Sequence, residues 1–120
     1  MANEGVASEG VANEGVANET VICTYRVHPD AEAAFRKLLS RHWAVLHELE
    51  FVTDEHAVVL RRVDEPTYVE IFTWVDGGFG SAHTHPDVLA IWEAMDPLLE
   101  ARDGREKWEF PHFRPVQFDV

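Results

Sequence analysis

The spacing of apolar residues from Thr20 onward constrains the fold of this chain more than any single motif. Apolar and polar residues alternate over residues 20–27 and 67–74, and residues 58–63 are expected to form a further strand. Successive side chains of a strand point to opposite faces, so the alternation predicts strands with two different faces. A last extended segment, residues 108–118, contains two prolines. Proline cannot donate to a sheet ladder, which predicts an edge strand, an irregular strand, or one that crosses to another subunit.

Two segments between these strands carry apolar residues at helical spacing. The first follows Pro29 and Asp30, and Asp30 is the expected N-cap. The second begins at Pro86, which suits a first helical position, and we expect Pro97 to kink or break it.

The predicted order is strand, helix, strand, strand, helix, strand. It favours an α+β fold of the ferredoxin-like βαββαβ type, with two helices on one face of a four-stranded antiparallel sheet. The first and third strands are then neighbours. The opposite sheet face has no helix to cover it, yet it is largely apolar. A second copy is the simplest cover, so we expect a homodimer through the open sheet face.

Composition restricts the partners. A length of 120 residues allows one small domain, and the formal net charge of −12 argues against a nucleic acid or an anionic membrane as the main partner. Cys23 is the single cysteine, which fits a reducing cytoplasm. Neither a membrane-spanning run nor a signal peptide is recognisable. The expected partners are a small-molecule ligand and a second copy of the chain.

The first residues repeat a five-residue unit: ANEGV, ASEGV, ANEGV and ANETV. A period of five fits neither a helix nor a strand, and the unit has little apolar surface. We therefore expect residues 1–19 to be a disordered tail and residues 20–120 to be the folded domain. An acidic interaction tail is the alternative reading.

The segment from Tyr68 to Met95 is the most informative one for a site. An alternating strand ends at Trp74, a turn with Gly77 and Gly78 follows, and His83 and His85 then lead into the second helix. This places an aromatic side chain and two imidazoles at one end of the sheet. It predicts a pocket mouth there, with residues 76–82 as a mobile loop over it.

The stretches YVEIFTW, SAHTHP and VLAIWEAM, together with the element order, resemble the dimeric α/β-barrel superfamily. The nearest branch is that of antibiotic-biosynthesis-monooxygenase-like domains. The resemblance implies a cofactor-free monooxygenase that binds an aromatic substrate between sheet and helices. Haem-degrading members instead combine a Trp and a His, matched here by Trp74 and His83, with an Asn on the first strand. That strand, VICTYRV, has no Asn, and Thr24 could only partly imitate it.

In this reading the candidate catalytic residues are His83, as a base, and Trp74, as a stacking wall. A helix N-terminus beside His83 would lower its pKa and leave a neutral base. The alternatives are a helix-entry histidine and a tryptophan that packs the core or the dimer interface. The candidate substrate-binding residues are Tyr25, Tyr68, Glu70, Phe72, Phe79, His85 and Trp92.

Glu70 is the unusual charge, because it alternates with Tyr68 and Phe72 on an aromatic face. A buried carboxylate needs a partner, and Arg26 and Arg61 are the expected ones. Its role is either structural or that of a ligand-orienting acid or base. No metal site is expected, because two histidines at i and i+2 do not share a helix face. His42 and His47 are expected to be surface or partly buried residues.

Three functions remain open from the sequence. The first is a cofactor-independent monooxygenase-like enzyme acting on a small aromatic or polyketide-like compound. The second is a non-catalytic binding or stress-response module of the same fold. The third, with haem as cofactor, is a haem-binding or haem-degrading protein.

Overall fold

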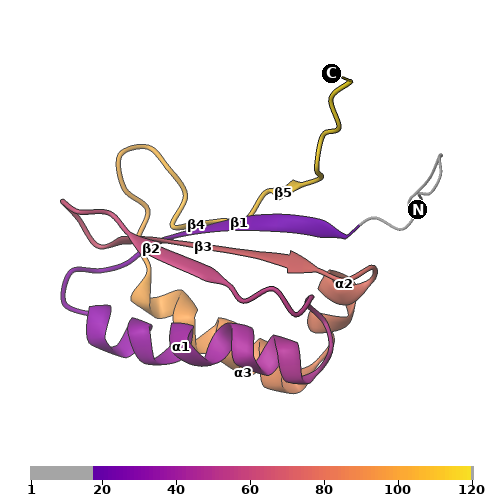
Figure 1. Cartoon of the computed structure of the whole chain (residues 1–120). Coiled ribbons are helices and arrows are strands. Elements are labelled where there is room, and N and C mark those ends of the chain that lie inside the picture. Colours follow the sequence, from indigo (N-terminus) through magenta and orange to yellow (C-terminus); the bar gives the residue numbers. More distant parts are fainter. Residues whose placement is uncertain (1–17, 120) are drawn as a thin grey trace.

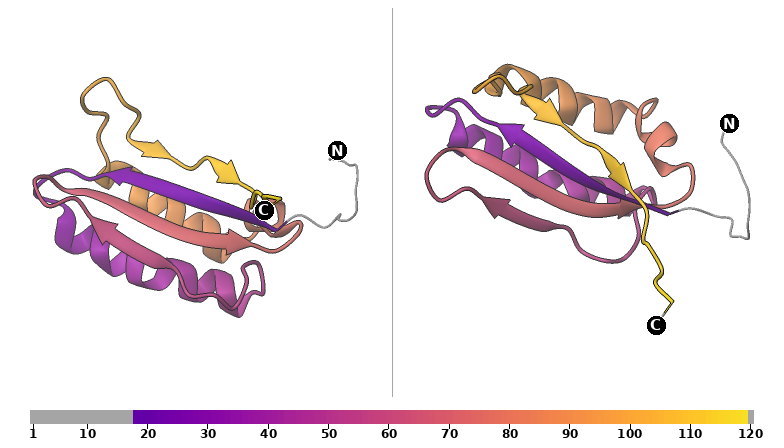
Figure 2. Two further views of the ribbon diagram at one scale, coloured as in Figure 1. Left: turned by 45° about the horizontal axis from the view of Figure 1, so that its top comes forward. Right: turned by 90° about the horizontal axis from the view of Figure 1, so that it is seen from above.

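The structure is a computed structural model that describes residues 18–119. Strands β1 (Glu19–Arg26), β2 (Val58–Arg61) and β3 (Thr67–Trp74) form an antiparallel sheet with the short strands β4 (Trp108–Glu109) and β5 (His112–Phe113). The sheet order is β2-β3-β1-β4, and β5 also pairs with β1 (Figure 2). Helices α1 (Glu32–Glu48) and α3 (Pro86–Met95) cover one face (Figure 1). The ferredoxin-like prediction is confirmed.

The pairing of β1 with β3 forms the centre of the sheet. The register sets Cys23 opposite Glu70 and Tyr25 opposite Tyr68. Both strands alternate between buried and half-buried residues along most of their length, as a sheet covered on one face requires. The two strands predicted to be neighbours are therefore adjacent, and β3 has the predicted bounds.

The helices differ from the predictions in their ends. The N-cap of α1 is Ala31, without a side-chain cap bond, so the prediction of Asp30 as the cap is wrong. His85 caps α3, where its Nδ1 accepts from the Asp87 N–H at 3.2 Å. The predicted break at Pro97 is confirmed, because α3 ends at Met95 and a short 3₁₀ helix, η1 (Asp96–Leu98), follows.

The turn after β3 is more regular than predicted. Residues 78–82 form a one-turn helix, α2 (Gly78–Ala82), rather than a loop. Gly77 has a φ of 78°, which favours glycine. Gly78 is buried, and a Cβ there would collide with the Phe51 carbonyl oxygen. These glycines therefore allow a close approach between two chain segments.

The last extended segment is broken into β4 and β5 because Pro111 interrupts it. The Ile22 N–H donates instead to the Pro111 carbonyl oxygen, at 3.2 Å. The segment is thus the irregular edge strand that the prolines predicted. β2 is shorter than expected and ends at Arg61.

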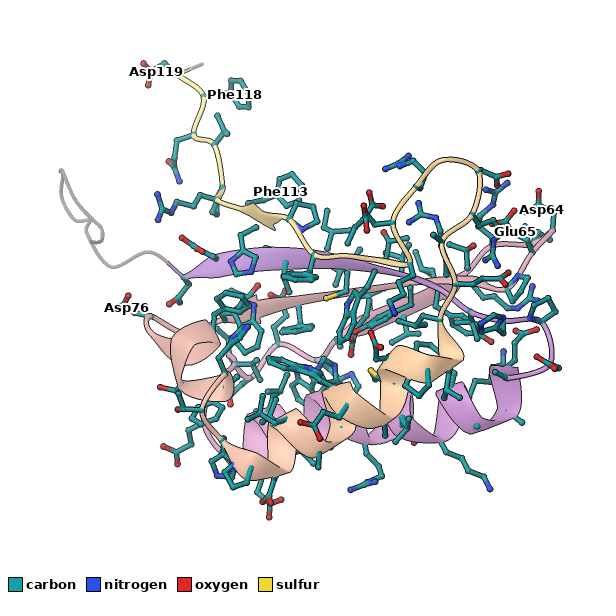
Figure 3. All side chains as sticks on the ribbon, turned by 180° about the vertical axis from the view of Figure 1, so that it is seen from behind. Asp64, Glu65, Asp76, Phe113, Phe118 and Asp119 are labelled. Atoms are coloured by element: carbon teal, nitrogen blue, oxygen red, sulfur yellow. The ribbon has the colours of Figure 1, made fainter. Side chains whose placement is uncertain are left out.

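The core lies between the inner sheet face and the helices. Its fully buried members include Tyr25, Phe35, Leu46, Val88 and Met95. Within residues 18–119 no element covers the opposite face, and the chain after β5 leads away from the sheet on that side (Figure 1). Phe113 and Phe118 also lie on that side (Figure 3).

The repeat in the first residues lies almost wholly outside the described residues, so the tail remains a prediction there, but its predicted end is wrong, because Glu19 already belongs to β1. Among residues 18–119, no helix has the length and apolarity needed to cross a membrane.

Candidate functional site

Aromatic side chains of the sheet and of helices α2 and α3 gather along the inner sheet face, from Trp74 opposite Glu19 to Trp108 opposite Tyr25. Phe79 contacts three of them: the ring centroids lie 4.3 Å from His83, 4.5 Å from His112 and 5.4 Å from Trp74. Trp92 lies 4.8 Å from His83 and 6.4 Å from Trp108. We call this group the aromatic cluster; its members are Phe72, Trp74, Phe79, His83, Trp92, Trp108 and His112.

A hydrogen-bonded chain of buried polar groups adjoins the aromatic cluster. Glu70 Oε1 accepts from the Tyr25 hydroxyl at 2.7 Å and lies 2.9 Å from His42 Nδ1. The Trp92 Nε1–H donates to His42 Nε2 at 2.9 Å. Glu70 has no exposed surface, and His42 is 2% exposed. Strands β1 and β3 and helices α1 and α3 each contribute one residue to this chain.

The donors of this chain fix the tautomer of His42. An indole N–H can only donate, so His42 Nε2 is the acceptor and carries no proton. The ring proton is therefore on Nδ1, which donates to Glu70. Glu70 Oε1 then receives two hydrogen bonds, while Oε2, also buried, has no partner among the described residues.

Four buried polar atoms of this region lack a hydrogen-bond partner within residues 18–119. They are Glu70 Oε2 and three ring nitrogens of the aromatic cluster: Trp74 Nε1, Trp108 Nε1 and His112 Nε2. Each unpaired buried group costs about 1–3 kcal/mol, so the presence of four of them along the inner sheet face needs an explanation. A bound molecule with both donors and acceptors would satisfy them.

Burial also changes the acid–base properties here. It raises the pKa of the Tyr25 hydroxyl well above its ordinary range, and the neighbouring Glu70 carboxylate raises it further. The pKa of the Cys23 thiol is raised in the same way, first by burial and then by Glu70. Tyr25 and Cys23 are therefore neutral, and Tyr25 acts as a donor to Glu70.

The two histidines predicted from the sequence lie in different surroundings. His83 belongs to the aromatic cluster but is exposed, and its Nδ1 bonds the Phe79 carbonyl oxygen at 2.8 Å. It is the C-cap of α2 and lies two residues before His85, the N-cap of α3. His85 contacts Phe51, at 5.9 Å, and lies outside the aromatic cluster.

Among the other predicted residues, Trp74, Phe72, Phe79 and Trp92 are members of the aromatic cluster, and Tyr25 and Glu70 adjoin it. Tyr68 is separate. Its hydroxyl donates to Glu32 at 2.7 Å and accepts from Arg36 at 2.8 Å, both on α1. Its polar group is thus already paired at the other end of the sheet.

The predicted partners of Glu70 are wrong. Arg26 pairs with Glu109 at 2.8 Å, and Arg61 pairs with Glu32 at 2.8 Å. Arg26 follows Tyr25 on β1 and so belongs to the opposite sheet face. The actual partner, His42, was expected at or near the surface. A signal did exist, since Phe35, Leu39, His42 and Leu46 form the buried stripe of α1 at helical spacing.

Trp108 and His112 are further members that the sequence reasoning did not select as site residues. Their inward position depends on pairing with β1, where Trp108 lies opposite Tyr25 and His112 opposite Val21. Alternation within the segment suggests that Trp108 and His112 share a face, but the proline break hides the register.

The residues do not fit a haem site of the kind that the resemblance suggested as an alternative. Thr24 pairs with Val69 and alternates with the inward Cys23 and Tyr25, so it faces the side opposite Trp74. It cannot stand in for the missing Asn. Within residues 18–119, no group of three His, Cys, Asp or Glu side chains is arranged to hold a metal ion.

A groove lies on the other side of the helices. It has a volume of about 580 Å³ and is lined by residues of α1 and α3 and the turn after α1: Leu38, Arg41, Val45, Glu48, Leu49, Asp87, Ala90, Ile91 and Ala94. None of the unpaired atoms described above lines it, so it is not the candidate site.

No family model matches the chain, and no curated protein matches it. Solved structures do. A putative antibiotic biosynthesis monooxygenase from Caulobacter crescentus superposes with a TM-score of 0.70 at 16% identity, covering 85% of this chain and 92% of the other. SnoaB, a cofactor-independent oxygenase from Streptomyces nogalater, gives 0.63 at 22% identity, covering 87% and 96%. A Streptomyces coelicolor monooxygenase in complex with nanaomycin D gives 0.64 at 13% identity, covering 87% and 92%.

At these identities the likeness concerns the fold. It agrees with the resemblance seen in the sequence, and it covers nearly the whole length of each of these structures. The chain therefore has the ferredoxin-like fold of the antibiotic-biosynthesis-monooxygenase-like proteins.

Proposed function

We propose that this protein is a cofactor-independent monooxygenase-like enzyme that acts on a small aromatic or polyketide-like compound at the aromatic cluster. The observation that carries the proposal is the group of buried, unpaired donors and acceptors among aromatic rings. Stacking surfaces and a few convergent polar groups are what a planar polar ligand requires. Two proteins of the same fold, an oxygenase and a monooxygenase with a bound ligand, support it.

In this proposal each part of the site has a role. The substrate ring packs against Trp74, which is 4% exposed and whose own N–H lacks a partner. One substrate hydroxyl, distinct from the group that is deprotonated, donates to Glu70 Oε2, and a substrate carbonyl accepts from Trp108 Nε1. Tyr25 and His42 hold the carboxylate in place from its other oxygen. In such a buried site these hydrogen bonds are stronger than in water.

His83 is the proposed acid–base residue at the exposed edge. Its Nδ1–H donates to the Phe79 carbonyl, which leaves the Nε2 lone pair free to accept a proton and exchange it with solvent. Removal of a proton leaves its electron pair on the substrate, and the electron-rich carbon then bonds to dioxygen. A protonated hydroperoxide at a former CH₂ carbon loses water and leaves a carbonyl. One oxygen atom enters the product and the other leaves as water.

The open sheet face is the proposed dimer interface. Ile22, Ile71 and Val58 lie side by side across three strands on that face, and Val58 and Leu60 are 52% and 56% exposed. A second copy would bury this row and complete a dimeric α/β barrel. Apolar rows of this kind on a monomer signal an interaction surface.

Light scattering of Ile71→Asp tests the interface. The wild-type chain should have twice the monomer mass at micromolar concentration, and the variant should have the mass of the monomer. Val63→Asp is the matched control, because Val63 is fully exposed beyond the end of β2. A wild-type monomer would contradict the dimer.

Oxygen uptake with a panel of hydroquinones and anthrones tests the enzyme. We expect uptake without added metal, haem or flavin, and a loss of at least tenfold in Trp74→Ala. Trp43→Phe is the control, because Trp43 packs on His47 and His56, outside the aromatic cluster. Binding of these compounds without any oxygen uptake would contradict the enzyme and favour a binding module.

A further inference from the structure

A carboxylate–histidine pair joins the start of β1 to β5 at the edge of the aromatic cluster. Glu19 Oε1 lies 2.9 Å from His112 Nδ1, and Glu19 Oε2 accepts from Arg114 at 2.6 Å. Both Glu19 oxygens are thus engaged. The hydrogen bond from His112 is the largest cause that holds the pKa of Glu19 below its ordinary value, so the carboxylate is ionised at neutral pH.

This pairing determines which nitrogen of His112 can accept a proton. An ionised carboxylate can only accept, so the His112 ring donates from Nδ1, and in the neutral ring it is Nε2 that carries the lone pair. The Nε2 atom is buried and has no partner among residues 18–119. The arrangement has the parts of a general base: an unprotonated nitrogen, and a carboxylate that orients the ring and stabilises it once it is protonated.

The position of His112 connects it with the proposed substrate. Its ring stacks on Trp74, with centroids 6.5 Å apart and an interplanar angle of 27°, and it meets the edge of Phe79 at 4.5 Å. His83 contacts the same Phe79 at 4.3 Å and is exposed, whereas the free nitrogen of His112 is buried. A base acting on a substrate packed against Trp74 therefore lies on the His112 side.

We propose that His112 is the residue that removes the proton from the bound hydroxyarene, with Glu19 as its positioning residue. This inference rests on the proposed function and deepens it. The substrate O–H bond breaks, its electron pair stays on the oxygen, and the proton forms an N–H bond on His112 Nε2. The positive charge on the imidazolium is balanced by Glu19. His83 then serves for exchange of protons with solvent.

The test is the ionisation of a bound phenol, which needs no turnover. The probe is 4-nitrophenol, whose phenolate absorbs at a different wavelength from the phenol. It is titrated with full-length wild-type protein at a pH below its own midpoint. We expect the phenolate fraction of the bound probe to exceed that of the free probe about tenfold or more in its ionisation ratio.

In His112→Gln the increased ionisation of the bound 4-nitrophenol should disappear. In Glu19→Gln, which keeps the imidazole, the pH of half ionisation of the bound probe should rise, and the whole pH profile should move with it. His28→Gln is the matched control, because His28 forms a similar pair with Glu100 at 2.8 Å, outside the aromatic cluster. It should behave as the wild type.

The inference is overturned if the wild-type protein neither binds nor ionises the probe, if His112→Gln still ionises it, or if only His83→Gln abolishes the gain. If His112→Gln does not fold, the shift in Glu19→Gln decides. The two proposals fail separately. Ionisation that depends on His112, without oxygen uptake from any hydroquinone, would refute the enzyme alone. Undiminished uptake in His112→Gln would refute this base alone.

Discussion

The two ends of the inner sheet face are built from similar residues but differ in how their polar groups are paired. At the end near the start of α1, the Tyr68 hydroxyl has two partners, Glu32 and Arg36. Arg61 donates two hydrogen bonds to the Glu32 carboxylate, at 2.8 and 3.1 Å. Along the rest of the inner face, from Trp108 opposite Tyr25 to Trp74 opposite Glu19, four buried nitrogen and oxygen atoms have no partner among the described residues. We call this stretch the unpaired end. The polar groups of the paired end stabilise the fold, whereas those of the unpaired end are free to bind a ligand.

This difference indicates that stability and function are separated along one sheet. Paired polar groups contribute to the folded state, while unpaired ones reduce its stability unless a ligand satisfies them. Glu70 both stabilises the fold and offers an acceptor to a ligand. One of its oxygens is held by Tyr25 and His42, and the other is free for a ligand.

The largest effect is expected for Glu70→Ala. The change leaves the Tyr25 hydroxyl and the His42 N–H buried without an acceptor, and it should lower the free energy of unfolding by about 3–5 kcal/mol. Tyr68→Phe, at the paired end, should cost only about 1 kcal/mol, because Glu32 keeps Arg61. Urea unfolding of both variants measures the contrast. Equal losses of unfolding free energy in the two variants would contradict the view that Glu70 is the required acceptor for Tyr25 and His42.

The next effect concerns the unpaired tryptophan. Trp108→Phe removes a buried N–H that has no partner, so the ligand-free protein should lose less than about 1 kcal/mol of stability despite the smaller ring. Binding of a hydroxyarene should weaken about tenfold, as the loss of one hydrogen bond implies. Calorimetric binding and thermal melts measure the two quantities.

Trp43→Phe is the control for this prediction. Trp43 Nε1 is also buried without a partner, but the residue lies away from the aromatic cluster, beside His47 and His56. It should change stability similarly and leave binding unaltered. A loss of affinity in both tryptophan variants would break the distinction between the two regions.

Much of the fold was predictable from the sequence because its elements are encoded by local patterns. Strand alternation and helical stripes fixed the element order, and β3 was placed with its observed bounds. The aromatic members Trp74, Phe79 and Trp92 were also found, because they lie within one continuous segment.

The unpaired end was only partly predictable, because its hydrogen bonds join residues far apart in the chain. His42 and Glu70 are 28 residues apart, and Glu19 and His112 are 93 apart. The period of α1 could have identified His42 as buried, but no local pattern reveals its partner. The position of His112 depends on a register that Pro111 interrupts.

A smaller effect is expected from pH at the paired end. Hydrogen bonds from Arg61 and Tyr68 lower the pKa of Glu32 from 4.5 to about 2. Because the folded-state pKa is depressed, the stabilisation by Glu32 is present above pH 4.5 and is lost as the pH falls toward 2. The difference in unfolding free energy between wild type and Glu32→Gln should shrink over this range. Its size is modest, since the Glu32 side chain is 27% exposed. A constant difference would contradict the assigned pairing.

The central claim is that the unpaired end binds a hydroxyl-bearing aromatic ligand through Glu70. Isothermal titration of 1-naphthol into wild type and Glu70→Gln tests it most directly. The amide oxygen of the variant can still accept from Tyr25 and His42, while an NH₂ group replaces the free oxygen. The account predicts saturable binding to the wild type and an affinity at least about tenfold lower in a folded Glu70→Gln. Equal affinities, or no saturable binding to the wild type, would contradict it.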